Sequence, residues 1–429
     1  MSRATLFLPC AAGIEALLAE EVQRLSGVAA EAARGGVWVE GDERLAMQLN
    51  LESRLAQRVL WPLVQGPYRD EHDLYRLACT VPWEHWITPE QTLRVDVSAQ
   101  RSPLQSLNFA ALRIKDAICD TLRLTLGARP SVDTRHPDLP IALFVGPETA
   151  AIYVDTSGEA LFKRGWREDK GEAPLKETLA AAMLAAAGWQ GRAEDGPLLD
   201  PCCGAGTIAI EAAQLACGIA AGGQRRFAFE RMLPFKPFAA AWRDLQRAAK
   251  ARVHPPAAPV FGGDVSFRMT DFATRNAERA GVRHAIEFKT GDALQRPPPT
   301  ARGLLLMNPP YGERITPKGT GQAGGHAAAP SGARQAFEGG AGAAEFYGGL
   351  AAQWKRHYAG WTAWLLSPDA KLPSQLRLKE SRRVPLWNGA IECRLFRFDI
   401  TAGAGPGDGA ARYRPASAPD ASGPQGQDR

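Results

Sequence analysis

With 429 residues, the chain is long enough for two or three domains, because domains average roughly 150 residues. Hydrophobic residues make up 45% and charged residues 23%, which is ordinary for a globular protein and argues against a disordered chain. The net charge of +5 permits a nucleic-acid partner but does not require one.

Cysteine and histidine usage argues against a disulfide framework and against a metal site. The seven cysteines are odd in number and contain no CxxC pair, and the seven histidines are scattered. We therefore expect a reducing, cytoplasmic location and no bound metal.

The start of the chain superficially resembles a signal peptide. An amphipathic pattern with acidic residues from Ile14 to Leu25 favours a strand, a turn and a helix at the start of a folded domain instead. The most apolar stretch, Leu179 to Trp189, is too short to span a bilayer, so we expect no membrane association.

The first 160 or so residues mix short strands and helices, which is an α+β pattern. Alternating apolar residues predict strands at Gly35 to Asp42 and at Leu93 to Gln100, and Ile141 to Gly158 has the pattern of two strands around a turn. Helical spacing of apolar residues predicts a helix within Phe109 to Gly127.

From Leu198 the pattern changes to a repeat of strand, Gly-rich turn and helix, after a helix predicted from about Leu175 to Ala187. This repeat predicts a parallel, doubly wound α/β sheet. Asn388 and Gly389 separate two strand-like runs and predict a terminal antiparallel hairpin. Such a sheet resembles that of S-adenosylmethionine-dependent methyltransferases. Its parallel strands are expected at 197–200, 259–264, 286–292, 303–308 and 361–367.

Two stretches have compositions typical of flexible segments. Residues 317–344 are mostly Gly, Ala and Ser, and the tail 401–429 is rich in Gly, Pro and Ser. The first is interpreted as a tolerated insertion, with a mobile loop over the site as the alternative.

Three successive strands of the predicted sheet end in an aspartate. The carboxyl ends of these strands meet at one edge, where open α/β folds bind ligands. Asp200 suits a ligand with a cationic amine, Asp264 can accept hydrogen bonds from ribose hydroxyls, and Asp292 can reach an adenine amine.

A glycine-rich turn follows Asp200. Gly204 and Gly206 let the backbone approach a ligand closely, and the helix after them offers free N–H groups. Together with Ala209 they also fit a dinucleotide fingerprint, but a carboxylate at position 200 would repel a pyrophosphate.

The fourth strand ends in Asn308-Pro309-Pro310-Tyr311. An exocyclic base amine is a poor nucleophile, because its lone pair is delocalised, and it needs acceptors that hold its N–H bonds. The side-chain oxygen of Asn308 and the carbonyl of Pro309 can supply two, and proline pre-organises that carbonyl. Tyr311 can stack on the base.

Two segments, DPCCGAGT and NPPY, resemble motifs I and IV of the class I amino-methyltransferases. From Leu6 to about Asp399 the chain resembles the THUMP-domain methyltransferases, and among them the bacterial 23S rRNA guanine-N2 methyltransferases. This closer resemblance rests on GGVWVEGD, KDAICD, RGWR, PLKETLAAA and LLDPCCGAGTIAIEAA.

The resemblance implies a ferredoxin-like and THUMP RNA-binding region in residues 1–160, with the THUMP domain at about 43–156. It implies a class I methyltransferase domain in 161–400 that uses S-adenosylmethionine to methylate a guanine N2 amine in 23S rRNA, free or in a large-subunit assembly intermediate. The site residues it implies are Asn308, Pro309 and Tyr311 for catalysis, and Asp200, Gly204, Gly206, Asp264 and Asp292 for the cofactor.

The chain departs from the family pattern in places. Cys202 and Ala205 stand where Met and Ser are usual, and Ser266 replaces a second acid, so ribose recognition is expected to depend on Asp264 alone. The insertion after Arg314 is not typical. Some members carry a second methyltransferase domain downstream, and the chain length leads us to expect the single-domain form.

Four basic residues are candidates for phosphate contacts. These are Lys115, Lys163, Arg164 and Arg167. For Trp166 we favour packing in the joint over stacking on a base.

Other functions stay open on the residues alone. A tRNA guanine, N6-adenine in nucleic acid, or a protein glutamine amide could be methylated at the same Asn-Pro-Pro-Tyr site. The α+β region argues against a DNA substrate. The intact Asp200, Asn308 and Tyr311 argue against an RNA-binding protein without activity, and Asp200 and the hairpin argue against a nicotinamide oxidoreductase.

Overall fold

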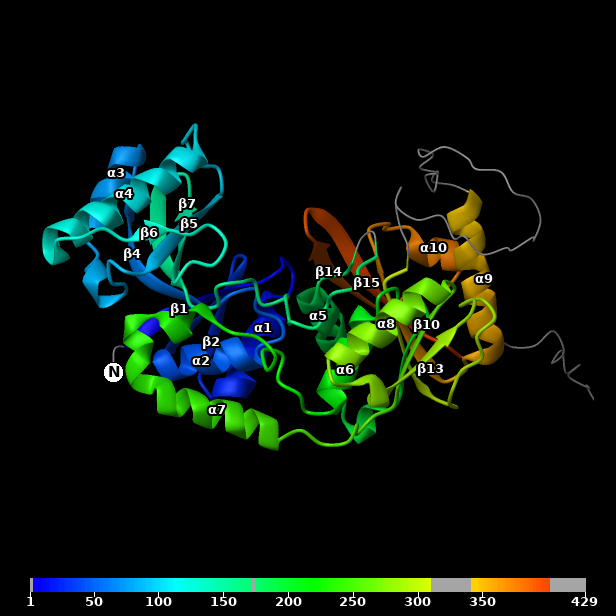
Figure 1. The fold of residues 1–429 in the computed structure, drawn as a ribbon. Coiled ribbons are helices and arrows are strands. Elements are labelled where there is room, and N and C mark those ends of the chain that lie inside the picture. The colour runs from blue at the N-terminus through cyan, green and yellow to red at the C-terminus, as the bar shows by residue number, and fades with distance from the viewer. Residues whose placement is uncertain (1–2, 172–173, 310–340, 402–429) are drawn as a thin grey trace, which may run out of the picture.

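The computed structural model describes residues 3–171, 174–309 and 341–401. In these ranges the chain forms an eight-stranded sheet in its N-terminal half and a seven-stranded sheet in its C-terminal half (Figure 1). The predicted combination of an α+β half with a doubly wound sheet is confirmed.

The N-terminal sheet has the order β2-β3-β1-β4-β8-β7-β5-β6. Because β4 pairs with β1 on one side and with β8 on the other, the ferredoxin-like part and the following α+β part share one continuous sheet. The strands are β1 (Ala4–Pro9), β2 (Ala30–Ala33), β3 (Gly36–Gly41), β4 (Leu60–Pro67), β5 (Thr92–Ala99), β6 (Ser131–Val132), β7 (Leu139–Val145) and β8 (Thr149–Asp155).

Four α-helices cover this sheet: α1 (Glu15–Ser26), α2 (Glu43–Glu52), α3 (Glu71–Cys79) and α4 (Leu107–Leu126). Three of them begin with an N-cap residue whose side chain accepts hydrogen bonds from free backbone N–H groups of the first turn. Asp and Ser are favoured in this role. The capping residues are Asp42, Asp70 and Ser106.

The C-terminal sheet has the order β11-β10-β9-β12-β13-β15-β14. Its strands are β9 (Leu198–Asp200), β10 (Val260–Asp264), β11 (Ile286–Thr290), β12 (Gly303–Met307), β13 (Trp361–Ser367), β14 (Arg382–Asn388) and β15 (Ile391–Asp399). The first five are parallel, and β15 pairs antiparallel with β13 and β14, so the predicted hairpin is confirmed. The α-helices of this half are α5 (Glu177–Ala187), α6 (Thr207–Ala216), α7 (Ala239–Ala251), α8 (Phe267–Arg279), α9 (Ala341–His357) and α10 (Leu372–Leu376).

The two stretches predicted to be flexible lie mostly outside the described residues. Of 317–344, residues 341–344 are described, and they form the start of α9. Of 401–429, Thr401 is described.

Between α6 and β10 the chain leaves the second sheet and runs to the N-terminal half. This crossover segment, residues 218–255, contains two 3-10 helices, η3 (Ala228–Arg231) and η4 (Leu233–Phe238), followed by α7, which lies along α2 (Figure 1). Its backbone bonds directly to that half, since Gly222 N–H donates to the Leu51 carbonyl at 2.8 Å. The sequence did not predict this excursion.

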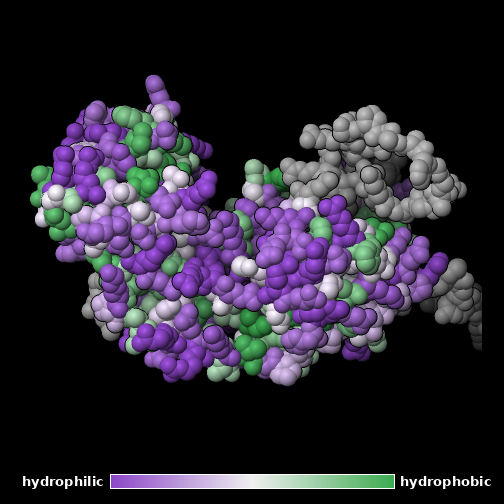
Figure 2. Space-filling model, in the orientation of Figure 1, coloured by the Kyte–Doolittle hydropathy of each residue, from purple (hydrophilic) through white to green (hydrophobic). Residues whose placement is uncertain are grey.

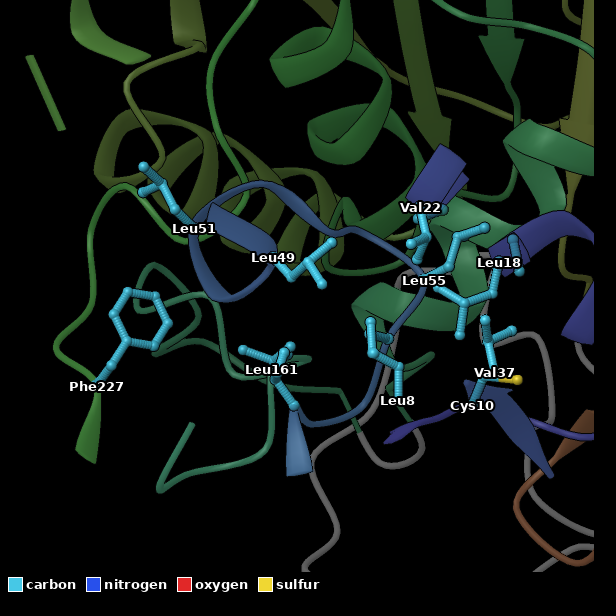
Figure 3. Packing of buried hydrophobic residues seen from close by; sticks show 14 of the residues in the cluster. Leu8, Cys10, Leu18, Val22, Val37, Leu49, Leu51, Leu55, Leu161 and Phe227 are labelled. Atoms are coloured by element: carbon cyan, nitrogen blue, oxygen red, sulfur yellow. The ribbon is translucent and has the colours of Figure 1, made fainter. Parts of the chain in front are cut away.

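The main hydrophobic core extends across both halves. One cluster of buried side chains includes Leu8 and Leu55 from the N-terminal half and Phe227 from the crossover segment. Figure 3 shows Leu18, Val22 and Leu55 gathered in this cluster, with Phe227 further along it. Shared burial of apolar surface joins the halves.

The outer surface is largely hydrophilic and is hollowed between the lobe that carries α3 and α4 and the lobe built on the second sheet (Figure 2). Within the described ranges, no helix has the length and apolar character needed to cross a bilayer.

Candidate functional site

The carboxyl ends of the parallel strands converge at one edge of the second sheet. Gly262 on β10 and Asp200 at the end of β9 are register partners, and Asp264 at the end of β10 is the partner of Thr290 on β11. β9 lies between β10 and β12, so the strand order reverses beside Asp200. Open α/β sheets bind ligands at such a switch point.

A tight glycine turn connects β9 to α6. Gly204 and Gly206 adopt φ angles of +52° and +89°, which residues with a Cβ rarely adopt. A Cβ on Gly204 would meet nothing within 4 Å, whereas a Cβ on Gly206 would lie 2.9 Å from the Cβ of Ala273. The turn is therefore open at Gly204 and packed against α8 at Gly206, and it leads into the free N–H groups of the α6 N-terminus.

Asp200 is almost fully buried, and its Oδ1 accepts the N–H of Cys202 at 3.2 Å. Burial raises its pKa to about 8, and the nearby Asp264 adds to that increase. The N–H of Cys202 and the guanidinium of Arg296 oppose the increase. A cationic ligand group next to Asp200 would favour its charged, carboxylate form.

Asp264 connects two neighbouring strand ends. Its Oδ2 accepts the N–H of Gly204 at 3.0 Å, and its Oδ1 accepts the N–H of Ser266 at 2.9 Å. Burial raises its pKa above the ordinary value, although both N–H donors act in the opposite direction.

Asp292 lies two residues past the end of β11, so the predicted strand was two residues too long. It is half-buried, and its Oδ1 accepts the N–H of Leu294 at 2.9 Å. Within the described ranges, no group of three or more His, Cys, Asp or Glu side chains is placed to hold a metal ion.

Asn308 is the first residue after β12, at the same edge. Its Oδ1 atom is buried and has no hydrogen-bond partner among the described residues. A buried acceptor without a partner is costly, so this oxygen is suited to accept a hydrogen bond from a ligand donor. Pro309 is buried beside it, whereas Tyr311 lies outside the described residues.

Three further residues at this edge were missed in the sequence. Val265 and Phe267 follow Asp264 and are 44% and 75% exposed, which is unusual for large apolar side chains. Their position directly after a strand-end acid was the available signal. Arg296 donates from Nη1 to the Gly262 carbonyl at 2.9 Å, and it comes from a loop that carries no motif.

Two of the four candidate RNA-binding residues are placed inside the protein, which corrects the expectation for them. Arg164 is 2% exposed and bonds through Nε to Glu211 at 3.0 Å. Arg167 bonds to Glu177 and to Thr207, both at 2.7 Å. The Arg164 side chain is buried, and that of Arg167 is only 9% exposed and engaged by its protein partners, so neither is presented to a phosphate.

Lys115 and Lys163 remain accessible. The Lys163 side chain is 56% exposed and pairs with Glu159, and Lys115 is half-buried and pairs with Asp116. Trp166 is buried, as we favoured.

Comparison with family models divides the chain into three parts. Residues 5–60 match the RlmL ferredoxin-like domain, residues 68–155 the THUMP domain, and residues 164–341 the RMKL-like methyltransferase domain.

A curated relative is ribosomal RNA large subunit methyltransferase K/L of Shewanella amazonensis, which is 36% identical over 397 residues. The match covers 91% of this chain and 52% of the relative, so the chain spans about half the length of the curated relatives it matches.

Two solved structures match nearly end to end, each with a TM-score of 0.79. One is a putative methyltransferase complexed with SAH, 25% identical, with 94% of this chain and 99% of that chain covered. The other is a possible methylase from Clostridium difficile, 27% identical, with 93% and 98% covered.

Proposed function

We infer that this chain, which belongs to the THUMP-domain class I methyltransferases, transfers a methyl group from S-adenosylmethionine to the N2 amine of a guanine in 23S rRNA. The observation that carries this proposal is that three aspartates meet at one switch-point edge with the Asn308 oxygen, which has no hydrogen-bond partner among the described residues. In the same chain, a THUMP domain precedes this edge.

The residues at the edge fit S-adenosylmethionine. Asp200 offers a buried carboxylate to the cationic amine, and the α6 N-terminus offers N–H groups to the carboxylate of the methionine part. We assign Asp264 to the ribose and the apolar surface of the exposed Val265 and Phe267 to the adenine. The putative methyltransferase that this chain resembles was crystallised with SAH. When bound, the cofactor supplies an electrophilic methyl group on a sulfonium.

The acceptor amine is held by this chain's own oxygens. Asn308 Oδ1, which lacks a partner in the described residues, accepts one N–H of the base amine, and the Pro309 carbonyl accepts the other. Both bonds hold the nitrogen in line with the methyl group and disperse the positive charge that develops on it. We assign the stacking of the base to Tyr311.

RNA is the substrate class favoured by the domain organisation. Relatives that match 91% of the chain are named as methyltransferases of large-subunit ribosomal RNA. The floor of the hollow between the two lobes and its wall on the side of α3 and α4 are mostly hydrophilic (Figure 2). We propose 23S rRNA, free or in an assembly intermediate, as the partner, with Lys115 and Lys163 contributing to phosphate contacts.

The test is mass-spectrometric mapping of methylated nucleosides in rRNA and tRNA from a deletion strain. The expected result is the loss of one N2-methylguanosine from 23S rRNA and its restoration by the purified protein with S-adenosylmethionine. Loss from tRNA, or loss of N6-methyladenosine, would replace the proposed substrate. Intact modification everywhere, with no binding of S-adenosylmethionine, would overturn the proposed function.

A further inference from the structure

A fully buried carboxylate lies on the helix that follows the glycine turn. Glu211 is in the second turn of α6 and is 0% exposed. Its Oε2 accepts a hydrogen bond from Arg54 Nη1 at 2.9 Å, and its Oε1 accepts one from Arg164 Nε at 3.0 Å. We call Arg54, Glu211 and Arg164 the interdomain triad.

The triad joins the halves because its members come from different parts of the chain. Arg54 follows α2 in the N-terminal half, whereas Arg164 lies in the segment that leads to α5. Arg164 Nη2 also donates to the Arg54 carbonyl at 2.8 Å, and Arg54 Nη2 donates to the Ile219 carbonyl just after α6. Leu51 and Leu55 on either side of Arg54 are buried in the core (Figure 3).

The ionic character of the triad makes it sensitive to the loss of one member. Burial alone would raise the pKa of Glu211, but the Arg164 and Arg54 guanidinium groups lower it below its ordinary value. Removing one partner of a buried pair leaves a charge without full compensation, so the remaining groups move to find another.

A second set of hydrogen bonds, made by Arg167, reaches α6 closer to the site. Arg167 Nη2 donates to the hydroxyl of Thr207, the first residue of α6, and Arg167 Nε donates to Glu177 of α5. Arg164 and Arg167 therefore hold the first two turns of α6, and Arg164 connects them to the N-terminal half through its hydrogen bond to the Arg54 carbonyl. The glycine turn that precedes Thr207 is set by the placement of this helix.

We propose that Arg54 is a positioning residue for the cofactor: through Glu211 it lets the N-terminal half set the place of α6 and of the Gly204–Gly206 turn. This inference rests on the proposed function and goes beyond it, since it gives the N-terminal half an indirect part in cofactor binding. Arg54 itself does not touch the cofactor. A displacement of about 1 Å at a reacting site can cost on the order of 100-fold, so a small shift of α6 is enough for a measurable effect.

The test compares Arg54→Ala with Arg58→Ala in the full chain. Arg58 is a matched control, because it also pairs with a buried carboxylate, Asp155, but entirely within the N-terminal half. S-adenosylmethionine affinity is measured by calorimetry without RNA, and KM values are measured for both substrates. We expect Arg54→Ala to weaken cofactor affinity and raise its KM by about tenfold or more, with RNA affinity unchanged, and Arg58→Ala to stay within twofold of wild type.

A conservative variant distinguishes a positioning role of Arg54 from general destabilisation of the protein. Arg54→Lys retains one charged donor to Glu211 and should recover part of the affinity. Cofactor affinity within twofold of wild type in Arg54→Ala, or an equal loss in Arg58→Ala, would overturn the proposal. If Arg54→Ala does not fold, Arg54→Lys against Arg58→Lys decides by the same measurement. Wild-type protein that fails to bind S-adenosylmethionine would overturn the proposed function instead.

Discussion

Asp264 Oδ2 accepts the backbone N–H of Gly204 at 3.0 Å, so the end of β10 holds the turn that follows β9. Sequence reasoning assigned Asp264 to the ribose. The hydrogen bond gives the same carboxylate a second task, because it keeps the open side of Gly204 in place before any ligand arrives. One residue thus contributes both a ligand contact and the shape of the site.

Replacement of Asp264 by Ala should therefore weaken S-adenosylmethionine binding by more than the ribose contact alone. Loss of hydrogen bonds to a charged acceptor costs about 1.5–3 kcal/mol, and release of the Gly204 turn adds to this. Calorimetric titration measures the affinity. The control is Asp195→Ala, which removes a carboxylate that bonds to Arg192 before the start of β9. Equal affinities in Asp264→Ala and wild type would show that the ribose is held elsewhere.

The two glycines of the turn should differ in their response to alanine. Gly206→Ala combines a strained φ of +89° with a Cβ only 2.9 Å from that of Ala273, and overpacking typically costs about 1–3 kcal/mol. Gly204→Ala adds a methyl group in open space, so we expect a smaller loss of stability and a clear loss of cofactor affinity. Urea unfolding with parallel cofactor titration measures both. Equal destabilisation would contradict the packing at Gly206.

Cofactor affinity should depend on pH through Asp200. Its pKa of about 8 leaves the carboxyl protonated at neutral pH in the cofactor-free protein, whereas pairing with an amine requires the carboxylate. Binding then releases a proton, so affinity rises with pH up to about 8, by at most about tenfold per pH unit. Asp200→Asn should bind more weakly and lose this dependence. If the affinities of the wild type and of Asp200→Asn change with pH in the same way, Asp200 does not face the amine.

The Asp200 carboxyl also affects the stability of the cofactor-free protein. Cofactor affinity should rise with pH, whereas this stability should fall. Because the folded pKa lies above the ordinary value of 3.8, the folded protein binds more protons than the unfolded chain between 3.8 and about 8. Its stability therefore falls as pH rises through this window, and the Asn variant should not show that contribution. Thermal unfolding without cofactor at several pH values measures it.

Removal of Lys163 should reduce the salt dependence of RNA binding. Its side chain is exposed and pairs with Glu159 on the surface, so it is free to exchange that partner for a phosphate. Each phosphate contact contributes about 0.7 to the slope of log affinity against log salt for single-stranded nucleic acid. Lys163→Ala should lower the slope by about this amount, whereas Lys250→Ala on the exposed side of α7 should not. An unchanged slope would remove Lys163 from the interface.

Local patterns predicted the edge of the second sheet well. Apolar runs that end in a polar residue mark the strands, and the glycines mark the turn, because these features depend on a few neighbouring residues. Asp200, Asp264 and Asn308 could be placed at one edge for this reason. The predicted strand ends were too long by two residues at Asp292, after β11, and by one residue at Asn308, after β12.

Burial of a charged residue could not be predicted in the same way. Arg164 was a candidate for a phosphate contact as a basic residue, and burial of its side chain was not foreseen. Its partner Glu211 lies 47 residues later, and another acceptor, the Arg54 carbonyl, lies 110 residues earlier. The crossover segment was missed for a related reason. The aromatic residues of the crossover segment, such as Phe229, indicate that the segment is buried. They do not indicate that it packs against the N-terminal half.

Replacement of Asn308 by Ala should abolish methyl transfer and leave cofactor affinity nearly unchanged. The side-chain oxygen is buried without a partner among the described residues, and we assign it to the base amine, not to the cofactor. Removing one such preorganised group typically costs about 100- to 1,000-fold in turnover. Transfer of labelled methyl groups to 23S rRNA measures the turnover, and calorimetry measures cofactor binding. Asn308→Asp is the informative companion, because it keeps an acceptor oxygen but adds a charge, so it should retain more activity than Ala. Wild-type turnover in Asn308→Ala would remove the residue from catalysis, and a parallel loss of cofactor affinity would move it to the cofactor site.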